Sequence, residues 1–454
     1  MFDANAKLPL APDVRVLGFT VGVCLFTGIL FGLVPALKTL KVQLASTLKD
    51  ATAIAQSRAR FGWGKGLVAT QVALSLLVLF AAGLLVRSLQ KLMAQDFGYD
   101  RNRLVIARLD PIGGGYTNDS MKTLAQQLVS RLESAPGVKA ATYSTNGLFA
   151  GSESADAIVV PGFNADKAKD RVAYEDYVGA DYFGIVGIPI INGRGIEVRD
   201  TATSTRVAVV NEAMVKYFFH GENPIGRQFT IDDPDWVNKP FTVVGISRNA
   251  KDHSTSLRED VKPRFYEAFQ QNPEPMQFNL EVEVTGSASA VVENVKSQIK
   301  SIDPNLPIGF IRTLDSLVTG SAADQIALAK LSSFFATLAL VLACIGLYGV
   351  MSYTVAARTR EIGVRMALGA RRFDVLRLVL REAMILVGMG LVVGIPLSLV
   401  SSRLLSSMLY GLKSTDPLSL FAVMAILTLV ATLAGYIPAR RATKVDPMIA
   451  LRYE

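Results

Sequence analysis

Few residues in this sequence have the types and spacing that catalysis or metal binding requires. The two histidines, His220 and His253, have no Cys, Asp or Glu companions at metal-ligand spacing, so we expect no metal site. The stretch GWGKG at 62–66 lacks the spacing of a phosphate-binding loop and has no Ser or Thr after Lys65. No serine nucleophile motif occurs in a supportive context. We therefore expect a chain that is not an enzyme, binds no cofactor and has no ATPase motif of its own.

The stretch REIGVRMALGARR at 360–372 draws attention because it is charged, favours a helix and lies between two strongly apolar segments. Apolar positions at i, i+4, i+7 and i+11 predict one helical face, formed by Ile362, Met366, Gly369 and Phe373. Arg358, Glu361 and Arg365 line another face, and the last two can pair at i, i+4. Such a helix could contact a partner protein or simply lie on anionic lipid, and periodicity alone does not separate the two.

The composition predicts an integral membrane protein around this stretch. Half of the 454 residues are hydrophobic, 19% are charged and the mean hydropathy is +0.33. Crossing about 30 Å of hydrocarbon takes about 17–25 apolar residues, and five segments meet this requirement: 16–37, 67–89, 331–353, 383–402 and 418–436. Cys24 and Cys344 each fall inside one of these segments, so no disulfide framework is expected. We expect a multi-pass α-helical protein in the cell inner (plasma) membrane.

Basic residues predict its orientation. They gather in the connections 37–65 and 358–382 and after residue 436, and the positive-inside rule places these stretches in the cytoplasm. The N-terminus and residues 90–325 are then outside, and the C-terminus is inside. Residues 90–325 hold 24 Lys and Arg against 30 Asp and Glu, so the net charge of +8 comes from the rest of the chain. We therefore expect no nucleic-acid partner.

The two ends of the chain contain an internal repeat. Within 32–50 and 435–454, six identical pairs align at one offset of 403 without a gap: Gly32/Gly435, Pro35/Pro438, Ala36/Ala439, Lys41/Lys444, Val42/Val445 and Leu48/Leu451. Residues 1–61 are accordingly interpreted as the last helix and cytoplasmic tail of a preceding repeat. Three helices of a whole repeat are missing.

The polar region between the second and third apolar segments is predicted to be an α+β domain. Alternation at 103–109 and 139–144 predicts two strands, with a helix between them. The same order recurs near 278–312. The expected fold is therefore a large extracytoplasmic α+β domain built from two β-α-β units plus an inserted strand-rich subdomain at about 150–275.

Several long phrases of the sequence resemble the FtsX-like permeases, and more narrowly those with a MacB-like periplasmic core domain. These phrases are VATQVALSLLVLFAAGLLVRSLQKL, DYFGIVGIPIINGRGI, VAVVNEAMVKYFFHGENPIGRQFTI and IGLYGVMSYTVAARTREIGVRMALGARR. The resemblance covers nearly the whole chain from about residue 62, in the family's order. It identifies 62–89 as the first transmembrane helix of the module, 90–325 as the periplasmic core domain and 326–454 as a three-helix permease domain.

The resemblance implies a function and partners. In such permeases the loop between the second and third helices forms a short cytoplasmic coupling helix that contacts a partner ATPase; here it corresponds to 358–378. The residues implied in this contact are Arg360, Glu361, Ile362, Arg365, Met366, Gly369, Ala370, Arg371 and Phe373. The chain would be the permease subunit of an ATP-driven ABC-type export system. A second permease module, in a homodimer or pseudo-dimer, is also implied.

Two alternatives stay open at this point. The chain could be an ATPase-linked signalling protein, or one that regulates a cell-wall hydrolase, in which the same movement switches an activity. It could also be a truncated remnant of a duplicated permease, because three helices are missing.

Overall fold

The computed structural model describes residues 14–15, 17–25, 28–29, 50–164, 167–236, 238–252, 257–275, 277–413 and 415–443, without the side chains of 50–63, 168 and 360. The chain forms two compact units. The first unit comprises Met1–Ala73, Ala343–Val393 and Thr428–Glu454, and the second comprises Leu74–Leu342 and Gly394–Leu427. In the predicted segment 16–37, residues 17–25 and 28–29 are helical, and the other residues lie outside the described ones. The first copy of the repeat, 32–50, lies outside them except for Asp50.

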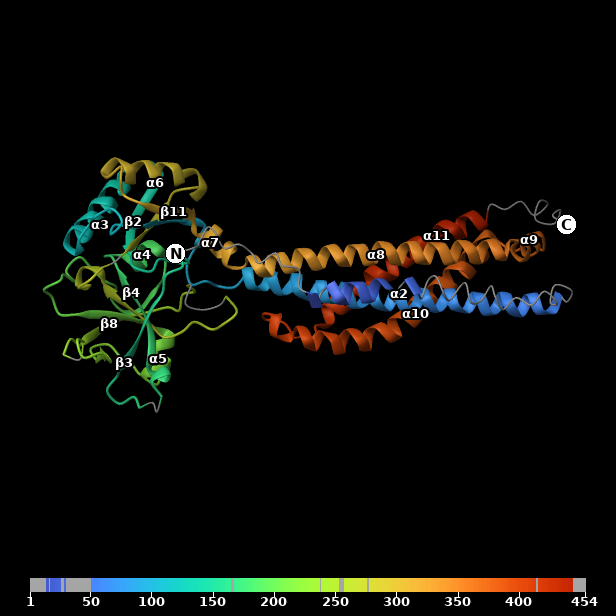
Figure 1. Ribbon diagram of the computed structural model, residues 1–454, viewed down its shortest axis with the longest axis horizontal. Coiled ribbons are helices and arrows are strands. Elements are labelled where there is room, and N and C mark those ends of the chain that lie inside the picture. Colours follow the sequence, from blue (N-terminus) through green and yellow to red (C-terminus); the bar gives the residue numbers. More distant parts are fainter. Residues whose placement is uncertain are drawn as a thin grey trace. The chain divides into compact units, whose positions relative to one another are not determined.

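Among the residues that the structure describes, four long helices are apolar enough to cross a membrane. They are α2 (Asp50–Met93), α8 (Ala323–Ala357), α10 (Arg372–Ser402) and α11 (Pro417–Ala442), and they are drawn in Figure 1. A helix satisfies its backbone hydrogen bonds internally, which is why apolar runs of this length become helices in lipid. The four predicted segments after residue 62 are therefore confirmed as helices of membrane-spanning length.

Small side chains allow close helix packing in the first unit. The packing core includes Val72 of α2, Met351 of α8 and Ala431 of α11, all of them buried. At Gly390 of α10, an added Cβ would lie 2.6 Å from Cγ1 of Val72. Close backbone approach at glycine is a common way for membrane helices to associate, because dispersion contacts replace the hydrophobic effect there.

Polar contacts hold the connection between α10 and α11 in the second unit. The connection includes a 3₁₀ helix, η5 (Arg403–Met408). The backbone N–H of Tyr410 donates to Oγ of Ser88 at 2.7 Å, and Arg87 forms an ion pair with Asp416. Asp416 also accepts from the backbone N–H of Ser419 at 2.9 Å, in the first turn of α11. These contacts fix the start of α11 beside the end of α2.

The soluble part of the second unit begins and ends with strand–helix–strand segments. The first is β1 (Leu104–Leu109), α3 (Asn118–Glu133) and β2 (Val138–Ser144), and the other is β10 (Phe278–Val284), α6 (Ala288–Ile302) and β11 (Ile308–Thr313). Their strands lie in the order β11-β1-β10-β2, with antiparallel pairing throughout. Figure 1 shows α3 and α6 beside one another, and both bury their apolar faces in one core with Leu128 and Val295.

The described residues between β2 and β10 form seven further strands. They are β3 (Ser154–Val159), β4 (Val172–Val178), β5 (Ile190–Gly193), β6 (Val207–Asn211), β7 (Gln228–Ile231), β8 (Phe241–Ser247) and β9 (Arg264–Ala268), with the short helices α4 (Tyr182–Val186) and α5 (Glu212–Phe218). Most of them contribute to an aromatic core that includes Phe229, Phe241 and Phe265, whereas α4 packs into another core with Tyr182 and Phe183. Strand β2 pairs with β4 at one position alone, Ser144↔Val178. The helix α7 (Leu314–Ser321) follows β11 and leads to α8.

Candidate functional site

The predicted coupling element at 358–378 consists of two helices, not one. The first is α9 (Thr359–Ala367), and the second is the start of α10 at Arg372. Between them Gly369 has φ +97°, a left-handed conformation that glycine adopts without the strain of a side chain. Asp374 accepts a hydrogen bond from the backbone N–H of Arg371 at 3.0 Å and caps the new helix. The prediction of a single helix was wrong, because the helical period does not continue through this turn.

The prediction that this apolar face points outward, toward a partner, is also wrong. Ile362 is 4% exposed and packs against Val375 of α10 and Ala442 of α11. Met366 packs against the same cluster, whereas Gly369 lies in the turn. Phe373 belongs to the next helix and is 67% exposed. Ile362 and Met366 therefore attach α9 to the first unit instead of facing a partner.

Three apolar side chains point outward in their place. Val364, Leu368 and Phe373 are exposed, Leu368 to 82%. We call these three residues the α9 surface. Val364 and Leu368 were missed in the sequence, although their i, i+4 spacing is as regular as that of Ile362 and Met366. The spacing identifies two apolar stripes, and burial by neighbouring helices is needed to tell which one is free.

Charged residues border the α9 surface. Glu361 and Arg365 form the predicted pair, with 2.6 Å between Oε1 and Nη2, and both side chains are about half exposed. Arg371 is exposed and Ala370 is half-buried. The side chain of Arg360 lies outside the described residues. An exposed pair of this kind contributes little to stability, about 0–1 kcal/mol, so it is available to a charged partner.

The carboxylate of Glu382 on α10 lies close to two cationic side chains from neighbouring helices. Its Oε1 lies 2.7 Å from Nη1 of Arg358, at the junction of α8 and α9, and its Oε2 lies 3.8 Å from Nζ of Lys65 on α2. The Glu382 side chain is 19% exposed. Removing either cationic partner would leave the negative charge of this half-buried carboxylate poorly compensated. The three residues therefore connect α9 electrostatically with α2 and α10.

No group of three or more His, Cys, Asp or Glu side chains in the described part of the chain is arranged to hold a metal ion. A group of buried charged side chains forms a network in the soluble part of the second unit. Arg264 of β9 is 4% exposed and contacts Glu153 at 2.5 Å and Asp252 at 2.7 Å.

Buried acids surround this network. Burial raises the pKa of Asp176 to about 7, against the lowering effects of Arg264 and of the Asn146 backbone N–H. Burial and the nearby carboxylate of Asp156 raise the pKa of Glu175 to about 8. Glu175 and Asp176 both lie on β4, which pairs with β3 and β9.

Two family models match the sequence. Residues 66–302 match the MacB-like periplasmic core domain, and residues 333–447 match the FtsX-like permease C-terminal domain. Similar proteins include the macrolide export ATP-binding/permease protein MacB of Mannheimia succiniciproducens, 26% identical over 282 residues. The pyoverdine export ATP-binding/permease protein PvdT of Pseudomonas entomophila is 31% identical over 295 residues. Each alignment covers 61% of this chain and 43% of the relative, so the chain spans less than half the length of these relatives.

Among solved structures, the periplasmic region of MacB from Actinobacillus actinomycetemcomitans is similar over 51% of this chain and 97% of that one. The sequence identity is 18% and the TM-score is 0.35.

Proposed function

The chain belongs to the family of proteins with a MacB-like periplasmic core domain, whose model matches more than half of its length, and we propose on this premise that it is the permease subunit of an ATP-driven export system. The FtsX-like match that follows along the chain and the export functions in the relatives' names support the proposal. A separate cytoplasmic ABC-type ATPase binds the ATP, and this chain binds no cofactor. Its helices transmit the movement of the ATPase to the extracytoplasmic domain.

The observation that carries the proposal is the α9 surface. Val364, Leu368 and Phe373 expose apolar area between two helices of membrane-spanning length, with charged side chains around them. An apolar patch with a polar rim is typical of a protein contact. We infer that this surface is the site of contact with the ATPase.

Contacts beneath the α9 surface provide a route by which a movement of α9 reaches α10 and α11. Ile362 is buried against Val375 and Ala442, so a displacement of α9 presses on α10 and α11. The ion pair between Arg358 and Glu382 adds a polar link to the same helix. Because packed side chains resist compression, a movement of α9 shifts these helices instead of being absorbed locally.

The proposal includes an orientation and a second module. The clustered basic residues place α9 and the C-terminus in the cytoplasm, and the domain between α2 and α8 outside. A second permease module, either another copy of this chain or a related one, completes the transporter.

The test replaces Leu368 with Asp. A carboxylate forced into an apolar interface without a partner costs several kcal/mol, so we expect at least a tenfold loss of ATPase binding. Leu404 on η5 provides a matched control, because it is 83% exposed, close to the 82% of Leu368, and lies on the opposite side of the membrane in the proposed orientation. The measurements are co-purification of the ATPase and its stimulated hydrolysis of ATP, at equal expression.

Leu404→Asp should leave both measurements unchanged. Retention of the ATPase by Leu368→Asp, or an equal loss in the two variants, would remove the assignment of α9 as the contact. Met366→Asp is unsuitable as the main test, because Met366 packs against Ile362 and its replacement would disturb the docking of α9 itself.

A further inference from the structure

The last turns of α11 have two faces of opposite character. Ala434 and Ala439 are buried in the packing core of the first unit. On the other side of the helix, Leu433, Tyr436 and Ile437 are 58%, 42% and 50% exposed. Because α11 is long and apolar enough to cross a membrane, an exposed apolar face on it is available to the acyl chains of lipids.

Two arginines end this exposed face. Arg440 and Arg441 follow Tyr436 and Ile437 at i+4, so the four side chains lie on the same side of α11. Together they line a cavity of about 280 Å³, and both arginines are exposed. A guanidinium group presents its N–H donors in a planar fork that matches the oxygens of a phosphate. The face therefore passes from apolar side chains to groups that recognise an anion.

The positive charge of the two arginines is not compensated by the part of the chain that the structure describes. Nη1 of Arg441 donates to the hydroxyl of Tyr348 on α8 at 3.1 Å. The side chain of Arg440 has no hydrogen bond or ion pair with a described residue, and neither guanidinium has a described carboxylate within 4.0 Å. Each guanidinium carries five N–H donors, so most of the ten are available to a ligand.

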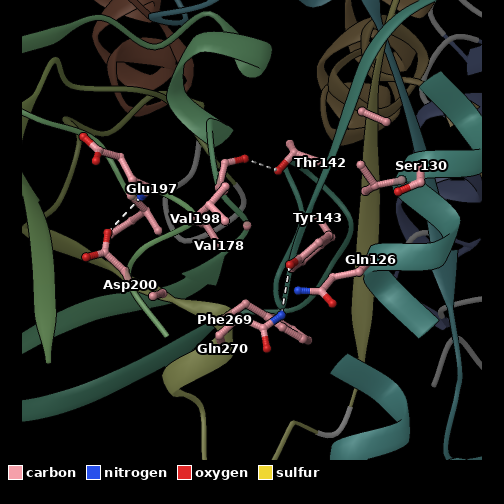
Figure 2. A pocket seen from close by; sticks show the side chains of 16 residues that line it. Gln126, Ser130, Thr142, Tyr143, Val178, Glu197, Val198, Asp200, Phe269 and Gln270 are labelled. Atoms are coloured by element: carbon pink, nitrogen blue, oxygen red, sulfur yellow. Dashed lines mark hydrogen bonds between the residues drawn. The ribbon is translucent and has the colours of Figure 1, made fainter. Parts of the chain in front are cut away.

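A larger cavity in the soluble part of the second unit has a different character. It measures about 390 Å³, and no Lys or Arg is among the described residues that line it. Figure 2 shows the hydroxyl of Tyr143 directed at Gln270, whose Nε2 donates to it at 3.3 Å. Thr142 donates to the carbonyl oxygen of Ala180 at 3.3 Å. A ligand there would compete with hydrogen bonds that the fold already makes, whereas the arginines of α11 offer free donors.

We propose that Arg440 and Arg441 bind the phosphate group of an anionic phospholipid. The charge of the arginines selects an anion, and the apolar side chains of Leu433 and Ile437 beside them select a lipid over a free phosphate. Tyr436 lies between the two kinds of group, and its amphipathic ring suits the boundary between headgroup and acyl chain. The site gives the chain a lipid-binding function beyond the transmission of movement.

The test uses the full chain in detergent and two lipids with the same acyl chains. The probes are dioleoyl phosphatidylglycerol and dioleoyl phosphatidylcholine, and binding is titrated by native mass spectrometry. Choline carries a positive charge that the arginines repel, so we expect phosphatidylglycerol to bind at least tenfold more tightly. Glycerol phosphate at millimolar concentration should not displace it, because this probe has no acyl chains. Displacement would identify a soluble phosphate as the ligand and overturn the proposal.

Two pairs of arginines provide matched variants. Arg440→Gln combined with Arg441→Gln should weaken the binding of phosphatidylglycerol at least tenfold. Arg377 and Arg381 of α10 are also exposed, and the positive-inside rule assigns them to the same side of the membrane, but they do not line the cavity. Arg377→Gln combined with Arg381→Gln removes the same charge and should leave the affinity unchanged.

Three results would contradict the proposal: equal affinity of the wild type for the two lipids, unchanged affinity in the Arg440 and Arg441 variant, or an equal loss in both pairs. The wild-type comparison holds even if a variant folds poorly. The same spectra count the chains in each particle, and a loss of subunits with lipid binding unchanged would identify this face as a contact with a second copy instead. These measurements contain no ATPase, so they are independent of the test of the α9 surface.

Discussion

At the scale of single residues, the soluble domain places carboxyl groups where their charged forms are unfavourable. Glu175 of β4 is an example, because burial and the neighbouring Asp156 raise its pKa to about 8 from an ordinary value of 4.5. Its Oε2 has no hydrogen-bond partner among the described residues. A side chain of this kind links the stability of the fold to the external pH.

We predict that Glu175→Gln weakens the dependence of stability on pH. Between pH 4.5 and about 8 the folded state keeps a proton that the unfolded state has lost, so the free energy of unfolding falls as the pH rises. Glutamine is neutral throughout and removes this contribution. From pH 5 to 8 the apparent melting temperature should fall less in the variant than in the wild type, by about 2–4 °C per kcal/mol removed.

Glu222→Gln serves as the control for this prediction. Glu222 pairs with Arg227 at the surface, and this arginine lowers its pKa, so its proton is lost below the tested range in both states. The control should keep the wild-type slope between pH 5 and 8. An unchanged slope in Glu175→Gln would show that the carboxyl is already ionised in the fold. Asp176, whose pKa is about 7, still contributes to the pH dependence of stability in every variant.

At the scale of elements, the first unit depends on how closely its helices approach one another. Gly390 of α10 faces α2, where an added Cβ would lie 2.6 Å from Cγ1 of Val72 and 2.9 Å from the carbonyl oxygen of Ala69. The Ala69 oxygen belongs to the backbone and cannot rotate away. Gly388, two residues earlier, has nothing within 4 Å of the same position. The two glycines therefore have different roles.

We predict that Gly390→Ala separates α2 from α10 and destabilises the protein by about 1–3 kcal/mol. Gly388→Ala should be neutral or slightly stabilising, because alanine in a helix is favoured over glycine by roughly 0.5–1 kcal/mol. The measurement is the apparent melting temperature in detergent, together with ATPase stimulation. Equal effects of the two substitutions would mean that helix propensity, and not the close approach, determines the result.

At the scale of the whole molecule, the four long helices and the charge distribution predict the side of the membrane on which each exposed segment lies. Ser287, just before α6, and Ala367, at the end of α9, are both exposed. They belong to regions that the positive-inside rule assigns to opposite sides.

We predict that Ser287→Cys is labelled by a membrane-impermeant maleimide in intact cells and that Ala367→Cys is labelled only after the cells are opened. Cys24 and Cys344 are replaced by Ser beforehand, because neither forms a disulfide and both are thiols that a maleimide modifies. The reverse pattern would invert the proposed orientation. Labelling of both positions in opened cells controls for accessibility.

Local patterns in the sequence were enough to predict the four described helices of membrane-spanning length and many strands of the α+β region. Their signals are local, because an apolar run of 20 residues or an alternation such as that of 278–284 depends on neighbours along the chain. The pair Glu361–Arg365 could be predicted for the same reason, since one turn of helix brings the two side chains together.

Which stripe of α9 is free, and where β2 pairs with β4, depend on segments that are distant in the sequence. Ile362 is buried because Val375 and Ala442 arrive from other helices, the second of them 80 positions away in the sequence. Strand β2 likewise pairs with β4 through Ser144 and Val178, which are 34 positions apart in the sequence. Burial and strand pairing depend on segments that are distant in the sequence, so the local periodicity of the sequence does not predict them.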